Sequence, residues 1–406
     1  MLKPTARGLV ILYSSTFLAG MWSMVIPTIP LLIVHFGISA GTAAQVITAL
    51  AIGRFVGMPI SGMVLDRLGT RAALLSGPVL AAVASLLAAI VPWFGAMLGL
   101  IALMGVGDSL WTFGRAIAGI DLALKEQRGR VLSGFHGVHN IGLALGPLLG
   151  GVITEAMGFR AAFVAYALCA AVSVPLGIIA PGTVPSHAPQ PASGFTRQWG
   201  AAALKQWLDG LQGLFNQIEP RLRSTYVVLV FATLTSFVHR VTLQSMLPLY
   251  ANARLGFTPS EIGLLFSIMG VFVFLMILPA GFIIDKVGRK WATVPSTGIP
   301  ALVFLFIPFS TTFLGLAVLM SLMGMANGLS LGSIATSTYD VVPARARGRL
   351  QAARRTIAEL GGVGAPLLGG LLADAFNPAV PFLIYAPLLV LSAVLLAVVG
   401  RETLPR

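Results

Sequence analysis

The chain has few charged residues: of its 406 residues only 10% are Asp, Glu, Lys or Arg, against about 25% in an ordinary soluble protein. So few charges cannot cover a water-exposed surface of this size, which excludes a cytosolic enzyme and a disordered chain. The single cysteine, Cys169, excludes internal disulfides and thiolate metal clusters. With 57% hydrophobic residues and a mean hydropathy of +0.91, the composition indicates a polytopic membrane protein.

The sequence also lacks the motifs of catalysis. It has no Gly-x-Ser-x-Gly elbow, no phosphate-binding Walker A loop and no spacing typical of metal ligands. We therefore expect neither an enzyme nor an ATP-driven pump, and we expect no cofactor and no metal.

Continuous apolar runs, rather than alternating ones, predict helices and exclude a β-barrel. A spanning helix needs about 20 residues. The apolar run at the N-terminus continues past residue 20, which excludes a cleavable signal peptide. Twelve spans are expected near residues 8–33, 43–65, 72–92, 95–120, 131–157, 160–181, 224–251, 260–284, 291–308, 312–340, 352–375 and 378–400.

The basic residues predict the orientation. The two termini and the even-numbered loops, together with Arg354 and Arg355 at the start of the expected span 352–375, hold 21 of the 26 basic residues. The odd-numbered loops hold only Arg160 and Arg254. Positively charged loops stay in the cytoplasm, so we expect a bacterial-type inner-membrane protein with both termini cytoplasmic. The excess of basic residues in the cytoplasmic loops then explains the net charge of +13, which in a soluble protein would suggest nucleic-acid binding. No nucleic-acid partner is expected.

One long linker divides the chain into 1–181, 182–223 and 224–406, two six-helix bundles around a connector. The linker begins with a Pro/Ser-rich stretch at 181–193. Apolar residues then recur at helical spacing, which predicts either an amphipathic helix on the inner leaflet or a connector packed against the bundle. These residues are Leu204, Trp207, Leu208, Leu211, Leu214, Phe215 and Ile218.

The sequence repeats itself at an offset of 219 residues, which indicates duplicated halves. The matching segments are Gly62–Gly69 with Gly281–Gly288, Arg128–Arg130 with Arg347–Arg349, Pro147–Gly151 with Pro366–Gly370, Gly37 with Gly256, and Asp121 with Asp340. Each unit holds six spans, so both halves enter the membrane in the same sense. We expect a pseudo-two-fold axis along the membrane normal and a cavity between the halves.

The chain resembles the major facilitator superfamily over essentially its whole length except the linker, and in particular its twelve-helix drug–proton antiporter branch. Residues 281–290 match the family's signature loop between the second and third helices of a half. The resemblance implies a charge cluster of Asp285, Arg289 and Asp340. The first half has Thr70 where the family usually has arginine. There Arg67 or Arg71 would have to bridge Asp66 to Asp121. The gating residues implied by the resemblance are Gly62, Asp66, Arg67, Gly69, Arg71 and Asp121, and Gly281, Asp285, Lys286, Gly288, Arg289, Lys290 and Asp340.

Two further motifs bear on mechanism through the same resemblance. Residues 115–119, Arg-x-x-x-Gly, resemble the family's motif for proton coupling, and residues 142–151 resemble its antiporter motif. Small residues let helices approach closely, and Pro147 permits a bend. Packing alone is the alternative interpretation. The residues of this second motif are Gly142, Gly146, Pro147, Gly150 and Gly151.

Ionisable residues deep in a membrane mark transport pathways. At about 1.5 Å per residue, Arg54, Asp108 and Arg240 lie about 16–20 Å below the outer side, near the midplane. A carboxylate there must pair or take up a proton. Two hypotheses remain open: Asp108 carries the coupling proton, with Arg54 and Arg115 acting on it, or Arg54 and Asp108 form a permanent structural salt bridge.

Arg240 has no acidic residue in its span or at the equivalent depth of its half, which favours a contact with an anionic group. Asn327 could bond it but not neutralise it. Glu359 lies near the cytoplasmic end of its expected span and beside two arginines, which favours an interface ion pair.

The candidate substrate-binding residues are Arg240, His239, Gln244, Met21, Trp22, Phe17, Trp111, His139, Asn140 and Asn327. Met and aromatic side chains suit an amphipathic ligand, although core packing explains them equally well.

The leading prediction is therefore a monomeric secondary transporter that exports small amphipathic molecules in exchange for protons, by alternating access. The alternative within transport is an uptake permease or lipid flippase for an anionic or zwitterionic solute. A non-transporting membrane sensor is the alternative from another class, but the short chain ends offer no signalling domain.

Overall fold

The computed structural model describes residues 4–123, 128–180, 212–343 and 346–404, and within these ranges it contains helices and no strand. Ten helices are long and apolar enough to cross a membrane. One of them, α3 (Ala40–Ile90), is two helices joined at Gly69, and a bent pair at 259–287 supplies one more span. The expected all-α fold of twelve spans is confirmed.

Each half holds six of these spans. The first half comprises α1 (Pro4–Gly20), η1 (Met21–Thr28), α2 (Ile29–Phe36), α3, α4 (Phe94–Leu122), α5 (Arg128–Met157) and α6 (Phe159–Ile179). The second comprises α8 (Pro220–Leu255), α9 (Pro259–Leu275), α10 (Ile277–Phe282), η3 (Ile283–Val287), α11 (Arg289–Phe306), η4 (Ile307–Phe309), α12 (Phe313–Val341), α13 (Arg347–Ala375) and α14 (Val380–Val398).

Equivalent residues begin and end equivalent helices. Gly69 and Gly288 both have positive φ, 82° and 147°, a conformation that favours glycine and lets the chain turn between two spans. Ser39 caps α3 by accepting a hydrogen bond from Thr42 N, and Thr258 caps α9 in the same way. These pairs keep the 219-residue offset, so the sequence repeat is also a repeat of local structure.

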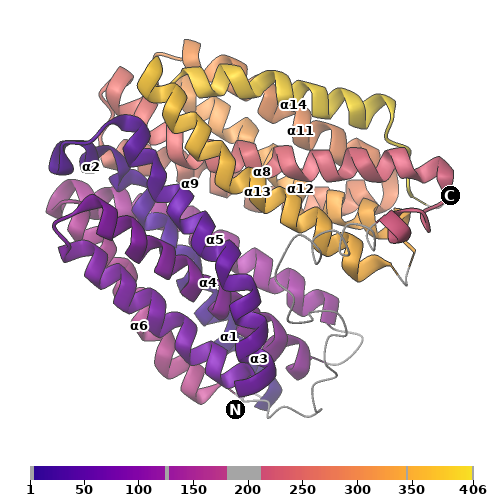
Figure 1. Cartoon of the computed structure of the whole chain (residues 1–406), viewed down its shortest axis with the longest axis horizontal. Coiled ribbons are helices and arrows are strands. Elements are labelled where there is room, and N and C mark those ends of the chain that lie inside the picture. Colours follow the sequence, from indigo (N-terminus) through magenta and orange to yellow (C-terminus); the bar gives the residue numbers. More distant parts are fainter. Residues whose placement is uncertain (1–3, 124–127, 181–211, 344–345, 405–406) are drawn as a thin grey trace.

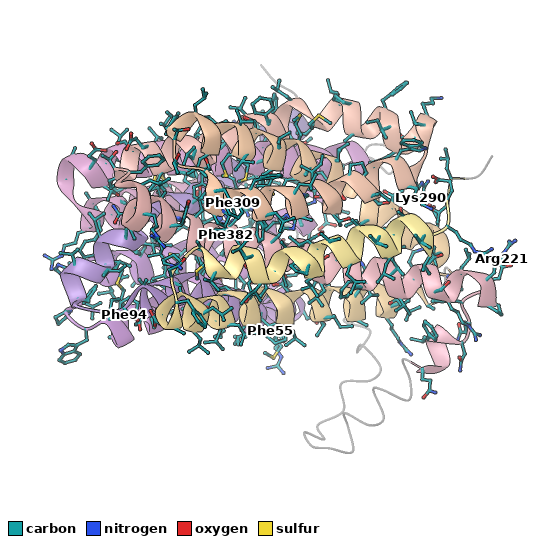
Figure 2. All side chains as sticks on the ribbon, turned by 90° about the horizontal axis from the view of Figure 1, so that it is seen from above. Phe55, Phe94, Arg221, Lys290, Phe309 and Phe382 are labelled. Carbon is teal, nitrogen blue, oxygen red and sulfur yellow. The ribbon has the colours of Figure 1, made fainter. Side chains whose placement is uncertain are left out.

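Large apolar side chains cover the outside of the bundle, among them Leu278, Leu314 and Trp291, which are 84%, 73% and 69% exposed. Basic side chains such as Lys290 and Arg221 gather at one end (Figure 2). An apolar flank with a charged end is the surface expected of a bundle whose sides contact lipid.

The two halves meet at one side of the molecule and diverge toward the other (Figure 1). We call the side of residues 36–40, 157–159 and 255–259 the far side, and the side that carries the chain ends the termini side. Between the halves, α3 packs on α13 and α5 on α9. Among the described residues, three of the four hydrogen bonds that join the halves lie at the far-side ends of these helices. In the fourth, Ser267 Oγ of α9 donates to Ala144 O, near the middle of α5.

Part of the linker prediction falls outside the described residues, namely 181–211. Residues 212–215 are helical, and Leu214, Phe215 and Ile218 pack in an apolar cluster with α8 and α13. In the described part, the connector therefore contacts the second half.

Candidate functional site

Five polar residues lie at one depth in the bundle. Counted from the far-side end of each helix, Arg54, Asp108, Arg240, Asn327 and Glu359 are 14 to 16 residues inside. At 1.5 Å per residue this is about 21–24 Å. Because they come from α3, α4, α8, α12 and α13, the fold gathers polar side chains from both halves at one level.

In the first half, Arg54 and Asp108 form an ion pair. Arg54 Nε donates to Asp108 Oδ2 at 2.8 Å, and the guanidinium stacks over the ring of Trp22 at 4.4 Å. Gly53 and Gly105 stand at the α3–α4 contact, where a side chain would collide with the facing backbone. The close approach lets the short Asp108 side chain reach Arg54. The other carboxylate oxygen, Oδ1, is buried without a hydrogen-bond partner.

Arg115 lies one level closer to the termini side and is only 3% exposed. It donates to Ser15 O and Thr112 Oγ1, both at 3.0 Å, and stacks over Trp111 at 4.9 Å. The Trp111 indole in turn donates to Ser15 Oγ at 2.8 Å. Within the described ranges Arg115 has no carboxylate in ion-pair range. The structure thus pairs Asp108 with Arg54 and leaves Arg115 on neutral partners.

The second half holds a different polar cluster at the same depth. Arg240 Nε donates to Asn327 Oδ1 at 3.2 Å, and its Nη2 donates to Ser330 Oγ. His239, fully buried, is hydrogen-bonded to Asn327 Oδ1 at 3.1 Å and to Thr235 O at 3.2 Å. Asn327 is the repeat equivalent of Asp108, so an amide holds the arginine here where a carboxylate holds it in the first half.

Glu359 was expected near the cytoplasmic end of its span, and this position was wrong. The structure starts α13 at Arg347, not at 352, which places the 6%-exposed Glu359 near the middle of the helix rather than at the membrane interface. It does pair with a neighbouring arginine, since Arg355 Nη2 donates to Glu359 Oε1 at 2.6 Å. Arg355 also stacks over Phe237 of α8 at 4.6 Å.

The remaining substrate-binding candidates divide by burial. Met21, Trp22 and Trp111 are 5% exposed or less and pack in the core, so they present almost no surface in this structure. The half-buried candidates are Phe17, His139, Asn140 and Gln244. Of these, Asn140 donates to His136 O one turn earlier on its own helix, while His139 Nδ1 is buried without a partner.

The expected charge cluster on the termini side is only partly formed. Arg289 pairs with Asp340 and also donates to Thr336 O at 3.3 Å. Asp285 is exposed and forms no ion pair within the described ranges. In the first half Asp66, Arg67 and Asp121 are likewise exposed and without an ion pair among described residues, while Arg71 donates to Ile178 O at 3.4 Å. In the second half the family-like loop is therefore joined to the end of its fourth helix by the Arg289–Asp340 pair.

The glycines of the 142–151 motif are contact points. A side chain at Gly142, Gly146 or Gly150 would collide with α1 or η1, and one at Gly151 would collide with the start of α9 in the other half. The motif thus packs α5 against both halves.

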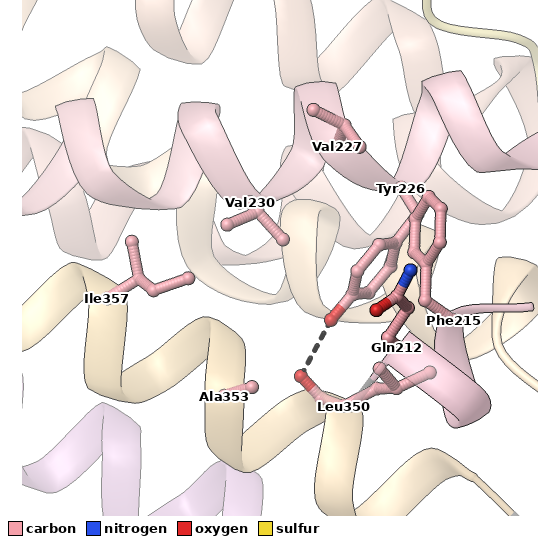
Figure 3. A pocket seen from close by; sticks show the side chains of 8 residues that line it. All are labelled: Gln212, Phe215, Tyr226, Val227, Val230, Leu350, Ala353 and Ile357. Carbon is pink, nitrogen blue, oxygen red and sulfur yellow. Dashed lines mark hydrogen bonds between the residues drawn. The ribbon is translucent and has the colours of Figure 1, made fainter. Parts of the chain in front are cut away.

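A separate pocket of about 300 Å³ opens at the termini end of α8 and α13 (Figure 3). Its apolar walls are closed at one end by Tyr226, whose hydroxyl donates to Leu350 O at 2.9 Å, with Gln212 beside it. It lies apart from the polar level, and it cannot be predicted from the sequence because it forms between the connector and two helices.

Comparison with known proteins supports the sequence resemblance. The family model of the Major Facilitator Superfamily matches residues 11–217 and 228–406. The chain is 23% identical to multidrug resistance protein MdtG of Enterobacter lignolyticus, covering 98% of this chain and 93% of that protein. It is 22% identical to multidrug resistance protein 2 of Bacillus subtilis, covering 92% and 90%.

Two solved structures share the fold. The inward-open xylose transporter XylE from E. coli has a TM-score of 0.74 at 17% identity, covering 97% of this chain and 96% of that one. A peptide transporter POT variant in complex with sulfate has a TM-score of 0.79 at 15% identity, covering 98% and 96%.

Proposed function

Since the chain belongs to the Major Facilitator Superfamily, we propose that this membrane transporter exports small amphipathic molecules in exchange for protons. The names of its full-length relatives, multidrug resistance proteins, support the direction of transport. The observation that carries the coupling is the buried carboxylate of Asp108, bonded through one oxygen to Arg54 and without a partner at the other.

The charge distribution supports a bacterial inner-membrane protein with both termini in the cytoplasm. With the termini side in the cytoplasm, the divergence of the halves toward that side supports an inward-facing state (Figure 1). Alternating access would open the far-side contacts between α3 and α13 and between α5 and α9, and would bring the termini-side ends together.

Asp108 would change its protonation between these states. Paired with Arg54, it is held as a carboxylate, so the inward-facing state releases its proton to the cytoplasm. If Arg54 turns away in the outward-facing state, Asp108 remains desolvated and takes up a proton from the outside. Substrate loaded from the cytoplasm then travels out as the proton travels in.

Proteoliposomes with an acidic lumen test this proposal, with cationic, neutral and anionic amphipathic solutes as substrates. The wild type should concentrate at least one solute in the lumen. Asp108→Asn should abolish accumulation while leaving downhill exchange of the same solute. The control Glu219→Gln removes a carboxylate from a surface pair with Arg221, 2.7 Å long, and should transport normally. A D108N protein that still concentrates solute under a pH gradient alone would contradict the coupling.

One observation favours the second candidate, an uptake permease for an anionic or zwitterionic solute. Arg240 at the polar level and Arg115 one level closer to the termini side have only neutral partners within the described ranges, which leaves positive charge inside the bundle. The same vesicles separate the two functions, because a permease coupled to protons in the same direction would accumulate solute from an acidic exterior and not into an acidic lumen.

A further inference from the structure

One group of charges in the second half has no role in the proposed proton step. It comprises Arg240 of α8 and Arg354, Arg355 and Glu359 of α13. The two helices pack against each other, and Phe237, one turn from Arg240, carries the guanidinium of Arg355 on its ring at 4.6 Å. Thr233, Phe237 and Arg240 follow one another at intervals of four and three residues on α8, and Arg354 of α13 donates to Thr233 Oγ1 at 2.8 Å. These side chains therefore share one face of the α8–α13 pair.

The group holds more positive than negative charge. Arg240 donates to Asn327 and Ser330, and Arg354 donates to Gln351 and to Thr233 at 2.8 Å, all neutral acceptors. Only Arg355 has a carboxylate, that of Glu359. Three guanidinium groups thus share one carboxylate inside a membrane-spanning bundle, where uncompensated charge is costly. Arg240 and Glu359 lie at the polar level, and Arg354 and Arg355 lie on α13 about one turn closer to the termini side.

The two side chains of the Arg355–Glu359 pair differ in how much of each is exposed. The side chain of Glu359 is 8% exposed, whereas that of Arg355 is 55% exposed. The arginine is the member that can turn toward a ligand, and the glutamate is the member fixed in the bundle.

The repeat does not require this pair. At the 219-residue offset, Arg355 corresponds to His136 and Glu359 to Asn140, so α5 keeps the same positions without an Arg–Glu pair. Since α5 packs without an Arg–Glu pair at these positions, packing does not require the pair in α13. Its presence there points to a role in ligand binding.

We infer that Arg240 and Arg355 bind the anionic group of an amphipathic substrate, and that Glu359 holds Arg355 in place of that anion while the site is empty. A carboxylate, sulfonate or phosphonate would take the guanidinium from Glu359 and bridge it to Arg240, with Phe237 beside the apolar part of the ligand. This inference rests on the proposed transport function and names the charge class of its substrate.

Binding to the purified full-length protein in lipid nanodiscs tests the site, with three probes of one shape and different charge: naphthalenesulfonate, naphthylmethanol and naphthylmethylammonium. Calorimetric titration should show tightest binding for the sulfonate. Arg240→Ala and Arg355→Ala should each weaken sulfonate binding by about tenfold or more, the size expected for a lost charge-assisted contact, and should leave naphthylmethanol within about twofold.

The direction in which Glu359→Gln changes sulfonate affinity decides the role of Glu359. If Glu359 competes with the ligand for Arg355, its removal should tighten sulfonate binding by about fivefold or more. A merely structural ion pair predicts weaker or unchanged binding of all three probes, and that result would overturn the inference. Glu219→Gln and Arg221→Ala, which break a surface pair, should change nothing. Arg240→Lys and Arg355→Lys keep the charge and should retain part of the affinity if the alanine variants fail to fold.

The outcomes for site and function are distinguishable. One possible result is that the variants change sulfonate affinity as expected, but a pH gradient drives no solute. That result would contradict the proposed transport function and support the anion site. Proton-driven transport that depends on Asp108, with no preference for the sulfonate, contradicts the anion site alone.

Discussion

The backbone N–H of Gly41, at the start of α3, donates a 2.7 Å hydrogen bond to Oδ1 of Asp374, at the end of α13 in the other half. The same contact occurs a second time, 219 residues displaced: Ser260 N, at the start of α9, donates to Glu155 Oε2, at the end of α5. A carboxylate on a helix N-terminus is favourable because it meets unpaired N–H groups and the positive end of the helix dipole. Two equivalent contacts therefore close the far side.

Gly370→Val should open this closure. A side-chain carbon at Gly370 would stand 2.7 Å from Gly41 O, too close for α3 and α13 to remain in contact. In a Cys169→Ser background, spin labels at the exposed positions Val34 and Leu314, on the far side of the two halves, should move apart. The matched control is Gly364→Val on the same helix, where the added carbon meets nothing within 4 Å. Equal label distances in both variants would contradict closure at this contact.

A second prediction concerns the glycine motif of α5. Gly142→Leu should reduce the amount of folded protein severely, because its first carbon already collides with the backbone of α1 at Phe17 and Gly20. Gly137→Leu, five residues earlier on α5, has open space and should fold as the wild type does. Size-exclusion chromatography of detergent extracts measures the difference. Comparable monodisperse yields from the two variants would show that close packing at Gly142 is unnecessary.

The sequence was sufficient for the spans, the repeat and the partnership of Arg54 with Asp108. These follow from hydropathy, self-comparison and counting along helices. It misplaced Glu359 because arginines at the start of α13 look like a loop, although the helix continues through them. The 219-residue offset also makes Glu155 and Asp374 equivalents, and this repeated acidic residue is a sequence signal for the far-side contacts.

Other features could not be read from one sequence, because they depend on how helices turn about their axes. Asp285 belongs to η3 and Arg289 begins α11 after the turn at Gly288, and it is Arg289 that pairs with Asp340 while Asp285 is exposed. The stacking of Trp22 on Arg54 joins residues of η1 and α3, and nothing in either segment alone indicates it. The pocket beside Tyr226 similarly exists only once the connector has packed on α8.

A double-mutant cycle should show that Arg289 and Asp340 act as a pair. Their side chains are 12% and 27% exposed, so either single alanine variant leaves a poorly hydrated charge and should lower the unfolding temperature by several degrees. The double variant should be less damaged than the sum of the singles, with a coupling of about 1–3 kcal/mol. Asp285→Ala, which removes an exposed carboxylate from the same loop, should have little effect. Strict additivity of the two alanine variants would contradict the pairing.

The last prediction concerns the start of α11, where the C-terminal segment acts as a cap. Glu402 accepts hydrogen bonds from the backbone N–H groups of Arg289 at 2.9 Å and Lys290 at 3.1 Å, the first residues of that helix. Burial raises the pKa of Glu402, but hydrogen bonds from the N–H groups of Leu404, Lys290, Arg289 and Thr403 outweigh it and hold the pKa below its ordinary value of 4.5. The carboxylate thus favours the folded state.

Glu402→Gln should therefore destabilise the protein at neutral pH by about 1 kcal/mol, the usual size of a lost cap. A folded-state pKa below the unfolded-state value means that this stabilisation is fully present above the unfolded value and disappears as the pH falls through the folded value. Thermal unfolding in detergent, followed from pH 7 downward, should show the wild-type and E402Q curves converging in the acid range. The control Glu219→Gln should leave the unfolding temperature unchanged at every pH. A gap between wild type and E402Q that persists undiminished at the acid end would show that the charge of Glu402 is not what holds the start of α11.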